Sequence, residues 1–494
     1  MARIKRRQIV LAILIVIAIG LGVSLFSEEG AKLGVGAPAW IPKPTIPSRM
    51  LHRQVPLVKT PAYAAAPGFE SALPSCRVTD LPNDPLVTEY GQNNIRLSRT
   101  YEGSGVRVRR VLQKAIRGEP IKIAVMGGSV STGHSLTWPH TAENHMHLRV
   151  HKWFQDTFPG AEHTINTDSA IPAVTARYFS YCIHETLPDD VDLILLEMDI
   201  NHDDPTPESL RSTEAMYRTI LSLPNQPAVI YMSVFALVFQ DLTHGWRHSA
   251  LISQWLDVPE INIRNWMLPH VMKHPEAIPP LYLNFADDLD IRHVNGKGHR
   301  AMGDMVIAYL REQLCLLSRD GPVEKQPSNP MWPTMDISRS LPRLGMLQPW
   351  DETSSMPLLY PKCQSITSTK FPLQPTVANG WESVDRNDKK SFEATVPGSE
   401  ISFNVHTDAG LLGMFFWMTN RDGFGQVACW VDGDQRDERI RRVAAYNPHH
   451  PASTFEHSGD LWNDLTPGDH IMTCRLETGP TGGNTFRIAA TVTR

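Results

Sequence analysis

The sequence predicts an α/β unit with a parallel five-stranded sheet covered by helices on both faces, a C-terminal all-β sandwich and an N-terminal transmembrane helix. Three observations predict this arrangement. Short apolar runs alternate with amphipathic stretches over residues 101–318, β-rich runs without helices fill residues 376–494, and one long apolar run lies near the N-terminus. A chain of 494 residues is long enough for two or three folded units.

The N-terminal apolar run spans Ile9–Phe26 and follows a basic stretch that includes Arg3 and Lys5. A helix of this length rises about 27 Å, which is close to the hydrocarbon thickness of a bilayer. Basic flanks stay in the cytoplasm, so residues 1–8 are expected to form a cytoplasmic tail and 9–26 a signal anchor. The alternative is a cleaved signal peptide, which leads to the same compartment. We therefore expect a single-pass type II membrane protein of the Golgi, the secretory pathway or the cell surface, with its bulk lumenal or extracellular.

The cysteines and the charge bear on compartment and partners. The chain has six cysteines, an even number that suits an oxidising compartment, and none lies in a C-x-x-C motif. Six cysteines allow 15 pairings, and Cys429–Cys474 is the pair expected first because both lie in strand-like runs of the C-terminal unit. The net charge is -5, and no long basic run follows the first seven residues, so nucleic-acid binding is not expected.

Residues 101–318 carry the alternating pattern. The continuous apolar run Val191–Met198 is typical of a central parallel strand. The expected strands are Ile121–Met126, Thr164–Thr167, Val191–Met198, Ala228–Val234 and Glu260–Ile263, and the expected helices are Thr141–Phe158, Ala176–Leu187, Glu208–Leu221, Ser249–Leu256 and Gly298–Leu316. This alternation predicts a parallel sheet with helices on both faces, in which ligands bind at the carboxyl ends of the strands.

Two proline-rich segments flank this unit. Residues 27–100 are expected to form a stem that holds it off the membrane, and residues 319–375 a linker. Beyond residue 376 the expected strands of a sandwich are Glu400–His406, Gly410–Met418, Gln426–Asp432, His470–Glu477 and Thr485–Val492. Four tryptophans of this unit are expected in its core, with a carbohydrate-binding face as the alternative, namely Trp381, Trp417, Trp430 and Trp462.

The first candidate for chemistry is Ser129, in a Gly-Gly-Ser-Val-Ser sequence directly after the first strand. A serine on a tight strand-to-helix turn presents its hydroxyl at the carboxyl edge of the sheet, and its own N–H can face a developing oxyanion. Glycines suit such a turn because a side chain would crowd it. An ordinary turn is the alternative, and the G-x-G-x-x-G pattern of a dinucleotide loop is not matched.

The second candidate is the pair Asp290 and His293, just before the last helix of the unit. A neutral histidine is a suitable general base near neutral pH, and a carboxylate three residues earlier can hold its tautomer and stabilise the imidazolium. A solvated loop is the alternative. The position of this pair in an α/β unit that already offers an exposed serine favours a catalytic role.

These two stretches carry a family resemblance that covers roughly residues 100–318. GGS after the first strand and D-x-x-H-x-N-x-x-G-H before the last helix resemble blocks I and V of the SGNH/GDSL hydrolases, with GGS in place of the commoner GDS. The resemblance implies a flavodoxin-like three-layer fold and a serine esterase in which Ser129 is the nucleophile and Asp290 and His293 are its acid–base partners. The layout of anchor, hydrolase unit, linker and β unit is similar to fungal and algal membrane-anchored, capsule-associated-like SGNH proteins.

The other two blocks are matched unevenly. After the third parallel strand, Asn201 occupies the place of the block III asparagine, so the resemblance implies that its side chain joins the N–H of Ser129 in the oxyanion hole; a helix cap or turn is the alternative. The block II region, Asn166–Pro172, has no glycine. The amide of Ser169 or Ala170 is a possible substitute there.

The expected function is hydrolysis of O-acyl, above all acetyl, groups on a glycan or polysaccharide of the secretory pathway or cell wall. A glycan O-acetyltransferase with the same triad and an inactive glycan-binding or scaffold protein are the alternatives. The expected partners are an acylated glycan and the membrane. No cofactor and no metal are expected, and His202-Asp203-Asp204 is read as a polar loop in preference to a metal cluster.

Overall fold

The computed structural model describes residues 75–494 except 202–205, 240–245, 322–339, 354, 356–360, 369, 387–389 and 450–453. Within these ranges no helix combines the length and the apolar character that a bilayer crossing requires. The expected anchor, residues 9–26, and most of the expected stem lie outside the described residues.

The first half of the described chain is an α/β unit built on a six-stranded sheet in the order β1-β6-β5-β4-β2-β3. The five parallel strands occupy the places predicted from the apolar runs, and they are β2 (Lys122–Gly127), β3 (Thr164–Ala170), β4 (Leu193–Glu197), β5 (Ala228–Ser233) and β6 (Glu260–Asn262).

The prediction of a wholly parallel, five-stranded sheet was wrong in one respect. A sixth strand, β1 (Arg99–Tyr101), pairs antiparallel with β6 at the edge of the sheet, so the sheet is mixed. All three residues of β1 are only partly buried. A short edge strand with an Arg-Thr-Tyr sequence shows no apolar run, which is the signal that identified β2, β4 and β5.

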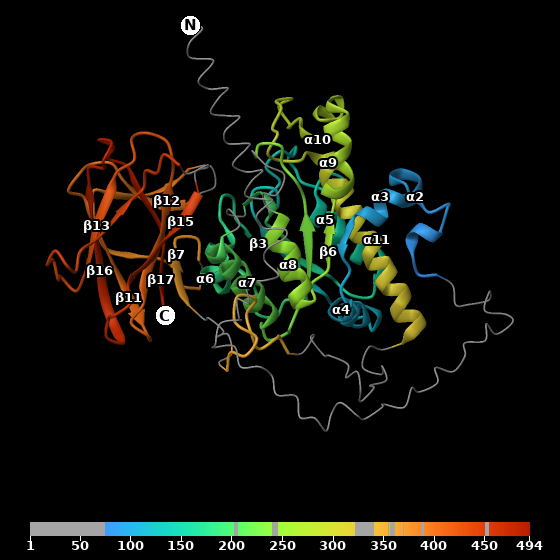
Figure 1. Cartoon of the computed structure of the whole chain (residues 1–494), viewed down its shortest axis with the longest axis horizontal. Helices are drawn as coiled ribbons and strands as arrows, with labels where there is room; N and C mark the ends of the chain where they lie inside the picture. The colour runs from blue at the N-terminus through green and yellow to red at the C-terminus, as the bar shows by residue number, and fades with distance from the viewer. Residues whose placement is uncertain are drawn as a thin grey trace, which may run out of the picture. The chain divides into compact units, whose positions relative to one another are not determined.

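Helices cover both faces of the sheet, as predicted (Figure 1). Side chains of alternate strand residues point to opposite faces. Ile123 and Leu195 pack on the side of α4 (Val106–Ile116), α5 (Met146–Thr157) and α11 (Gly296–Asp320). Ala124 and Leu196 pack on the side of α6 (Ala176–Thr186), α7 (Pro207–Leu221) and α8 (Trp246–Leu256). Shorter elements complete the unit, namely η2 (Val78–Asp80), α2 (Pro85–Tyr90), α3 (Gln92–Leu97), η3 (Asp199–Asn201), α9 (Arg264–Lys273), η4 (Pro275–Ala277) and α10 (Pro279–Tyr282).

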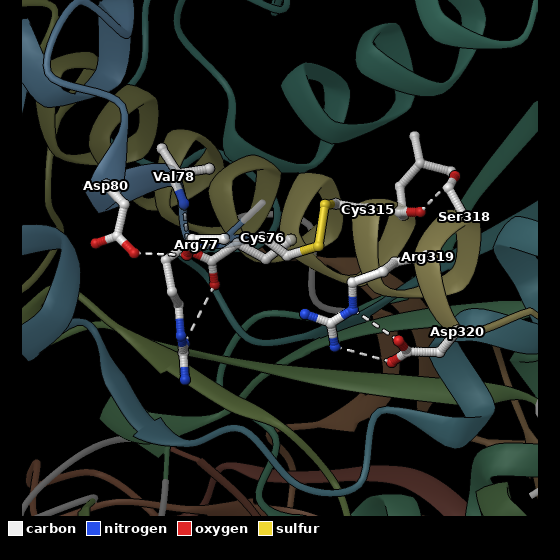
Figure 2. The surroundings of a disulfide bond; sticks show 11 residues. Cys76, Arg77, Val78, Asp80, Cys315, Ser318, Arg319 and Asp320 are labelled. Atoms are coloured by element: carbon white, nitrogen blue, oxygen red, sulfur yellow. Dashed lines mark hydrogen bonds and ion pairs between the residues drawn. A yellow bond between two sulfur atoms is a disulfide. The ribbon is translucent and has the colours of Figure 1, made fainter. Parts of the chain in front are cut away.

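The segment that precedes β1 is tied to the last helix of the unit. A disulfide joins Cys76 to Cys315 in α11 (Figure 2). Next to it, the N–H of Val78 donates to Glu312 at 3.0 Å, and Val78 and Ile95 are buried in the core of the α/β unit. Residues 76–97 thus fold onto the α/β unit, although their composition had placed them in the expected stem.

The C-terminal unit consists of two antiparallel sheets. They share one core, as predicted for a sandwich. One sheet has the order β15-β12-β17-β10-β9, with β7 beside β17, and the other has the order β14-β13-β16-β11-β8. The strands are β7 (Lys362–Ser365), β8 (Pro375–Asn379), β9 (Trp381–Asp385), β10 (Lys390–Ala394), β11 (Glu400–Thr407), β12 (Leu412–Met418), β13 (Gln426–Val431), β14 (Arg441–Ala444), β15 (Thr454–Trp462), β16 (Gly468–Glu477) and β17 (Phe486–Thr493).

Side chains of the sandwich settle two predictions. The disulfide Cys429–Cys474 is confirmed, and it links directly opposed residues of β13 and β16. The four tryptophans singled out in the sequence are all buried, with at most 8% of the side chain exposed in Trp417. Trp381 and Trp462 belong to the core between the two sheets. Trp417 packs in the apolar cluster shared with α6, and Trp430 lies under the guanidinium of Arg475. None of the four presents an exposed ring for a sugar.

The two units are also joined to each other. The disulfide Cys182–Cys363 links α6 to β7, and the hydroxyl of Ser368 donates to Glu185 at 2.6 Å. Side chains of α6 and of the first sheet of the sandwich form one continuous apolar cluster. The sandwich is thus packed against the α/β unit through a shared core.

Candidate active site

The Ser129 turn leaves β2 at its carboxyl end, the edge at which the sequence predicts a ligand site. The carbonyl of Ser129 accepts a hydrogen bond from the hydroxyl of Thr132 at 2.8 Å and from the N–H of His134 at 3.1 Å. These bonds close the turn on its C-terminal side. Ser129 itself is 9% exposed, so its hydroxyl lies at the border of the interior.

Asp290 and His293 lie on the segment between α10 and α11. The N–H of Asp290 donates to the carbonyl of Tyr282 at 2.9 Å, and Leu237, after β5, donates to the carbonyl of Ile291 at 2.8 Å. α11 begins after Asn295, whose side chain caps it by accepting from the N–H of Lys297. The cap and the backbone bonds fix this segment at the same edge of the sheet as the Ser129 turn.

The structure brings the three predicted side chains together. Ser129 Oγ lies 2.8 Å from His293 Nε2 across 164 positions of sequence, and His293 Nδ1 lies 2.7 Å from Asp290 Oδ2. Both distances are within hydrogen-bond reach. With a proton on Nδ1, Nε2 of the imidazole is free to accept the serine proton. A hydroxyl, an imidazole and a carboxyl in this series can perform nucleophilic acyl transfer.

Asp290 is held in its ionised form. Burial raises the pKa of this carboxyl, but the hydrogen bonds from His293 and from the N–H of Arg292 outweigh the effect, so the pKa lies well below its usual range. The hydroxyl of Ser135 adds a further bond to Oδ2 at 3.0 Å. A permanent negative charge beside Nδ1 favours the imidazolium that forms when His293 accepts a proton.

Asn201 ends the 3-10 helix that follows β4, and its carboxamide packs against the Ser129 turn. A Cβ atom placed on Gly128 would overlap Asn201 Oδ1, so only glycine fits beside this side chain. No residue of the described chain forms a hydrogen bond with Asn201 Oδ1, although this atom is buried. The structure therefore places the predicted oxyanion donor Asn201 next to Gly128, the residue that precedes Ser129. The close approach of Asn201 explains why the second position of the motif is a glycine.

The block II region offers a different residue from those named in the sequence. Ser169 and Ala170 still belong to β3, opposite Met126 and Gly127. Beyond the strand, Ala173 adopts a left-handed backbone with φ 57°, a conformation that glycine takes most easily. Its carbonyl accepts a hydrogen bond from the N–H of Phe455 in β15, at 3.2 Å. A sandwich strand thus supports the turn that follows β3.

Sequence reasoning missed two residues of the loop that follows Ser129. Ser135 bonds to Asp290, and Trp138, three positions later, leaves 82% of its side chain exposed. The only sequence signal for them is their position on the loop after the nucleophile, because nothing in a Ser or Trp by itself predicts which loop it will face. Among the described residues, no group of three or more His, Cys, Asp or Glu side chains could hold a metal ion. The predicted polar loop His202-Asp203-Asp204 lies outside the described residues.

Comparisons with known proteins identify the fold that carries this site. No protein-family model matches the chain, and no curated protein matches its sequence. Among solved structures, it is similar to a two-domain esterase (CEX) active on acetylated mannans, co-crystallised with mannopentaose, with a TM-score of 0.56 and 18% identity over 81% of this chain and 97% of that chain. A second structure of such an esterase gives a TM-score of 0.57 and 17% identity over 81% and 98% of the two chains. The chain has the fold of a two-domain esterase. The likeness spans both the α/β unit and the sandwich.

Proposed function

We propose that the chain is a serine esterase of the SGNH type that removes acyl groups, above all acetyl, from a glycan. The observation that carries the proposal is the series Ser129 Oγ, His293 and Asp290, with separations of 2.8 and 2.7 Å. The fold shared with an esterase active on acetylated mannans supports the same class of substrate.

The reaction follows from the geometry in two steps. His293 Nε2 takes the proton of Ser129 as Oγ attacks the ester carbonyl, and the oxyanion is stabilised by the N–H of Ser129 and the side chain of Asn201. The C–O bond to the sugar breaks as the imidazolium returns the proton to the sugar oxygen. Water then attacks the acyl-serine with His293 as base, which releases the carboxylic acid and restores Ser129.

Exposed aromatic side chains on the two segments that carry the triad support a carbohydrate substrate. Trp138 is 82% exposed on the loop that follows Ser129, and Phe285 is 68% exposed on the turn that leads to Asp290. The bond between Ser135 and Asp290 joins these two segments. Three residues of extended chain span at most about 11 Å, so Trp138 lies within that distance of the bonded Ser135. An exposed aromatic ring on a loop that is bonded to the triad suits the apolar face of a sugar ring that neighbours the acylated one.

The experiment that tests the proposal uses acetylated mannan as substrate and acetate release as the signal. The wild type is expected to release acetate, and Ser129→Ala is expected to abolish the release while the fold, followed by circular dichroism, is unchanged. Equal rates for both proteins would leave only the inactive glycan-binding alternative. Addition of an unacetylated acceptor glycan separates the hydrolase from the O-acetyltransferase, because a transferase moves the acetyl group to the acceptor.

We propose further that this reaction takes place in the Golgi, the secretory pathway or at the cell surface. Three disulfides support an oxidising compartment, since cytosolic proteins rarely keep such bonds. Residues 9–26 would hold the protein as a type II membrane protein. Protease protection of a C-terminal epitope in intact microsomes tests the orientation. Digestion of the epitope without detergent would contradict it.

A further inference from the structure

Three polar side chains that the proposed reaction does not use lie directly behind the Ser129 turn. Ser131 Oγ donates to Glu197 Oε2 at 3.1 Å, and His147 Nε2 lies 3.1 Å from Ser131 Oγ. Glu197 and His147 are fully buried, and Ser131 is 2% exposed. A buried polar array of this kind costs free energy unless its members bond to one another, so its presence at this point requires a reason.

The direction of the hydrogen bonds follows from the groups themselves. Burial lowers the pKa of His147 well below its usual value, so the ring is neutral and carries one N–H. Because the Ser131 hydroxyl donates to Glu197, it is left to accept, and Nε2 of His147 is assigned as the donor to it. The series runs from α5 through the Ser129 turn to the end of β4, and it therefore ties three elements together.

This array holds the backbone on which Ser129 is mounted. Ser131 is two residues beyond Ser129, and a Cβ atom on Gly127 would overlap the Ser131 hydroxyl, so that side chain packs onto the start of the turn. Glu197 is paired with Gly127 across β4 and β2. The turn is thus fixed from the interior by Ser131, while the hydroxyl of Ser129 points to His293.

We propose that Glu197 and His147 are positioning residues that act through Ser131 to set the place of the Ser129 hydroxyl. The inference rests on the proposed function, because it takes Ser129 as the nucleophile. None of the three is expected to touch the substrate, so their loss changes the rate of attack and leaves substrate affinity as it is. A misplacement of about 1 Å in a catalytic group can reduce the rate on the order of 10²-fold.

The identity of a conservative replacement follows from the burial of Glu197. Burial and, next, the neighbouring Asp199 raise the pKa of Glu197 to about 8, so at neutral pH the carboxyl is mostly protonated. Glutamine has the same shape as a protonated glutamic acid and keeps an oxygen that accepts from Ser131. Glu197→Gln is therefore expected to rescue what Glu197→Ala loses.

The experiment compares Ser131→Ala, Glu197→Ala and Glu197→Gln with the wild type. One readout is kcat and KM for 4-nitrophenyl acetate. The other is the rate at which a fluorophosphonate labels Ser129, a step in which the Oγ–P bond forms, the P–F bond breaks and the hydroxyl proton leaves with fluoride. Both alanine variants should lose about 10- to 100-fold in kcat and in labelling rate with KM within about twofold. Glu197→Gln should stay within about threefold of the wild type.

A matched control removes a buried hydroxyl elsewhere. Thr219 in α7 is 4% exposed, and its hydroxyl donates to the carbonyl of Ala215 in the same helix, so Thr219→Val should react like the wild type. A folded Ser131→Ala that is labelled at the wild-type rate would overturn the inference and leave the proposed function intact. If Ser131→Ala does not fold, His147→Leu takes its place. A folded His147→Leu that is labelled at the wild-type rate would then overturn the inference. A wild type that neither turns over esters nor is labelled overturns both proposals.

Discussion

The hydroxyl of Ser135 donates to Asp290 Oδ2, the same carboxylate oxygen that holds His293 Nδ1. The distances are 3.0 Å and 2.7 Å. Ser135 follows the nucleophile on one loop, and Asp290 belongs to the segment before α11, so one oxygen atom connects the two halves of the site. This connection explains how a triad drawn from distant positions is held at hydrogen-bond distances.

Replacement of the carboxylate tests its role in orienting His293. Asp290→Asn keeps the size of the side chain but presents an N–H to the imidazole and favours the wrong tautomer, so kcat should fall by up to about 10⁴-fold. Steady-state kinetics on 4-nitrophenyl acetate measure the effect. Asp288→Asn, two positions earlier and exposed, is the matched control and should be unaffected. Equal kinetics for the two variants would remove Asp290 from the mechanism.

Loss of the proposed oxyanion donor should act on the chemical step alone. Asn201→Ala is expected to lower kcat by about 10²- to 10³-fold and to change KM little, because the bond is made to the charge that develops in the transition state. Asn225→Ala removes an exposed carboxamide that bonds to the carbonyl of Asp190, and it should leave both constants unchanged. A rise in KM with unchanged kcat would assign Asn201 to ground-state binding.

The exposed indole of Trp138, on the loop that follows Ser129, should matter for long substrates only. Trp138→Ala should raise KM for acetylated mannan by about 5- to 30-fold, as expected when a contact of about 1–2 kcal/mol is removed, and leave KM for 4-nitrophenyl acetate unchanged. Trp350 is also an exposed tryptophan, at 88%, and lies in the segment between the two units, so Trp350→Ala is the control. The same loss on both substrates would mean that Trp138 supports the fold of its loop.

The sequence identified those parts of the fold and the site that depend on local pattern. The apolar run at Val191–Met198 predicted β4, and the position of Ser129 after β2 and of His293 before α11 followed from alternation of strands and helices. Strands with polar surfaces were missed: β8 (Pro375–Asn379) is mostly exposed and therefore shows no apolar run. Such strands are formed by pairing with their neighbours, which single-sequence periodicity does not report.

Contacts between distant segments account for the rest. Glu197 and Ser131 lie 66 positions apart, and their bond depends on the register of β4 beside β2. The disulfide Cys182–Cys363 likewise depends on the docking of α6 against β7. A residue type such as Ser or Glu is compatible with many surroundings, so these side chains could not be assigned to the site before the contacts were known.

Stability should depend on pH through the buried carboxyl groups of the α/β sheet. Burial and, next, the charge of Asp199 raise the pKa of Glu260 to about 8, above its value of 4.5 in the unfolded chain. The folded protein therefore binds this proton more tightly, and the contribution to stability is present in full below pH 4.5 and is lost as the pH rises through 8. Burial lowers the pKa of His145 to about 4. This shift makes stability rise with pH, but it does so mainly below pH 6.5, the ordinary pKa of histidine.

Above pH 6.5 the opposing contribution of His145 is small. Between pH 6.5 and pH 8.5 the buried carboxyl groups act together with His470, whose pKa is raised by its hydrogen bond with Asp432, and a substitution at Glu260 separates the part due to this residue. In this window the melting temperature of the wild type should fall as the pH rises. Glu260→Gln has the shape of the protonated residue and cannot ionise, so its melting temperature should fall less, as measured by differential scanning calorimetry at both pH values. Glu89→Gln, at an exposed position of α2, is the control and should follow the wild type. Parallel curves for wild type and Glu260→Gln would show that Glu260 is already ionised in the folded protein at pH 6.5.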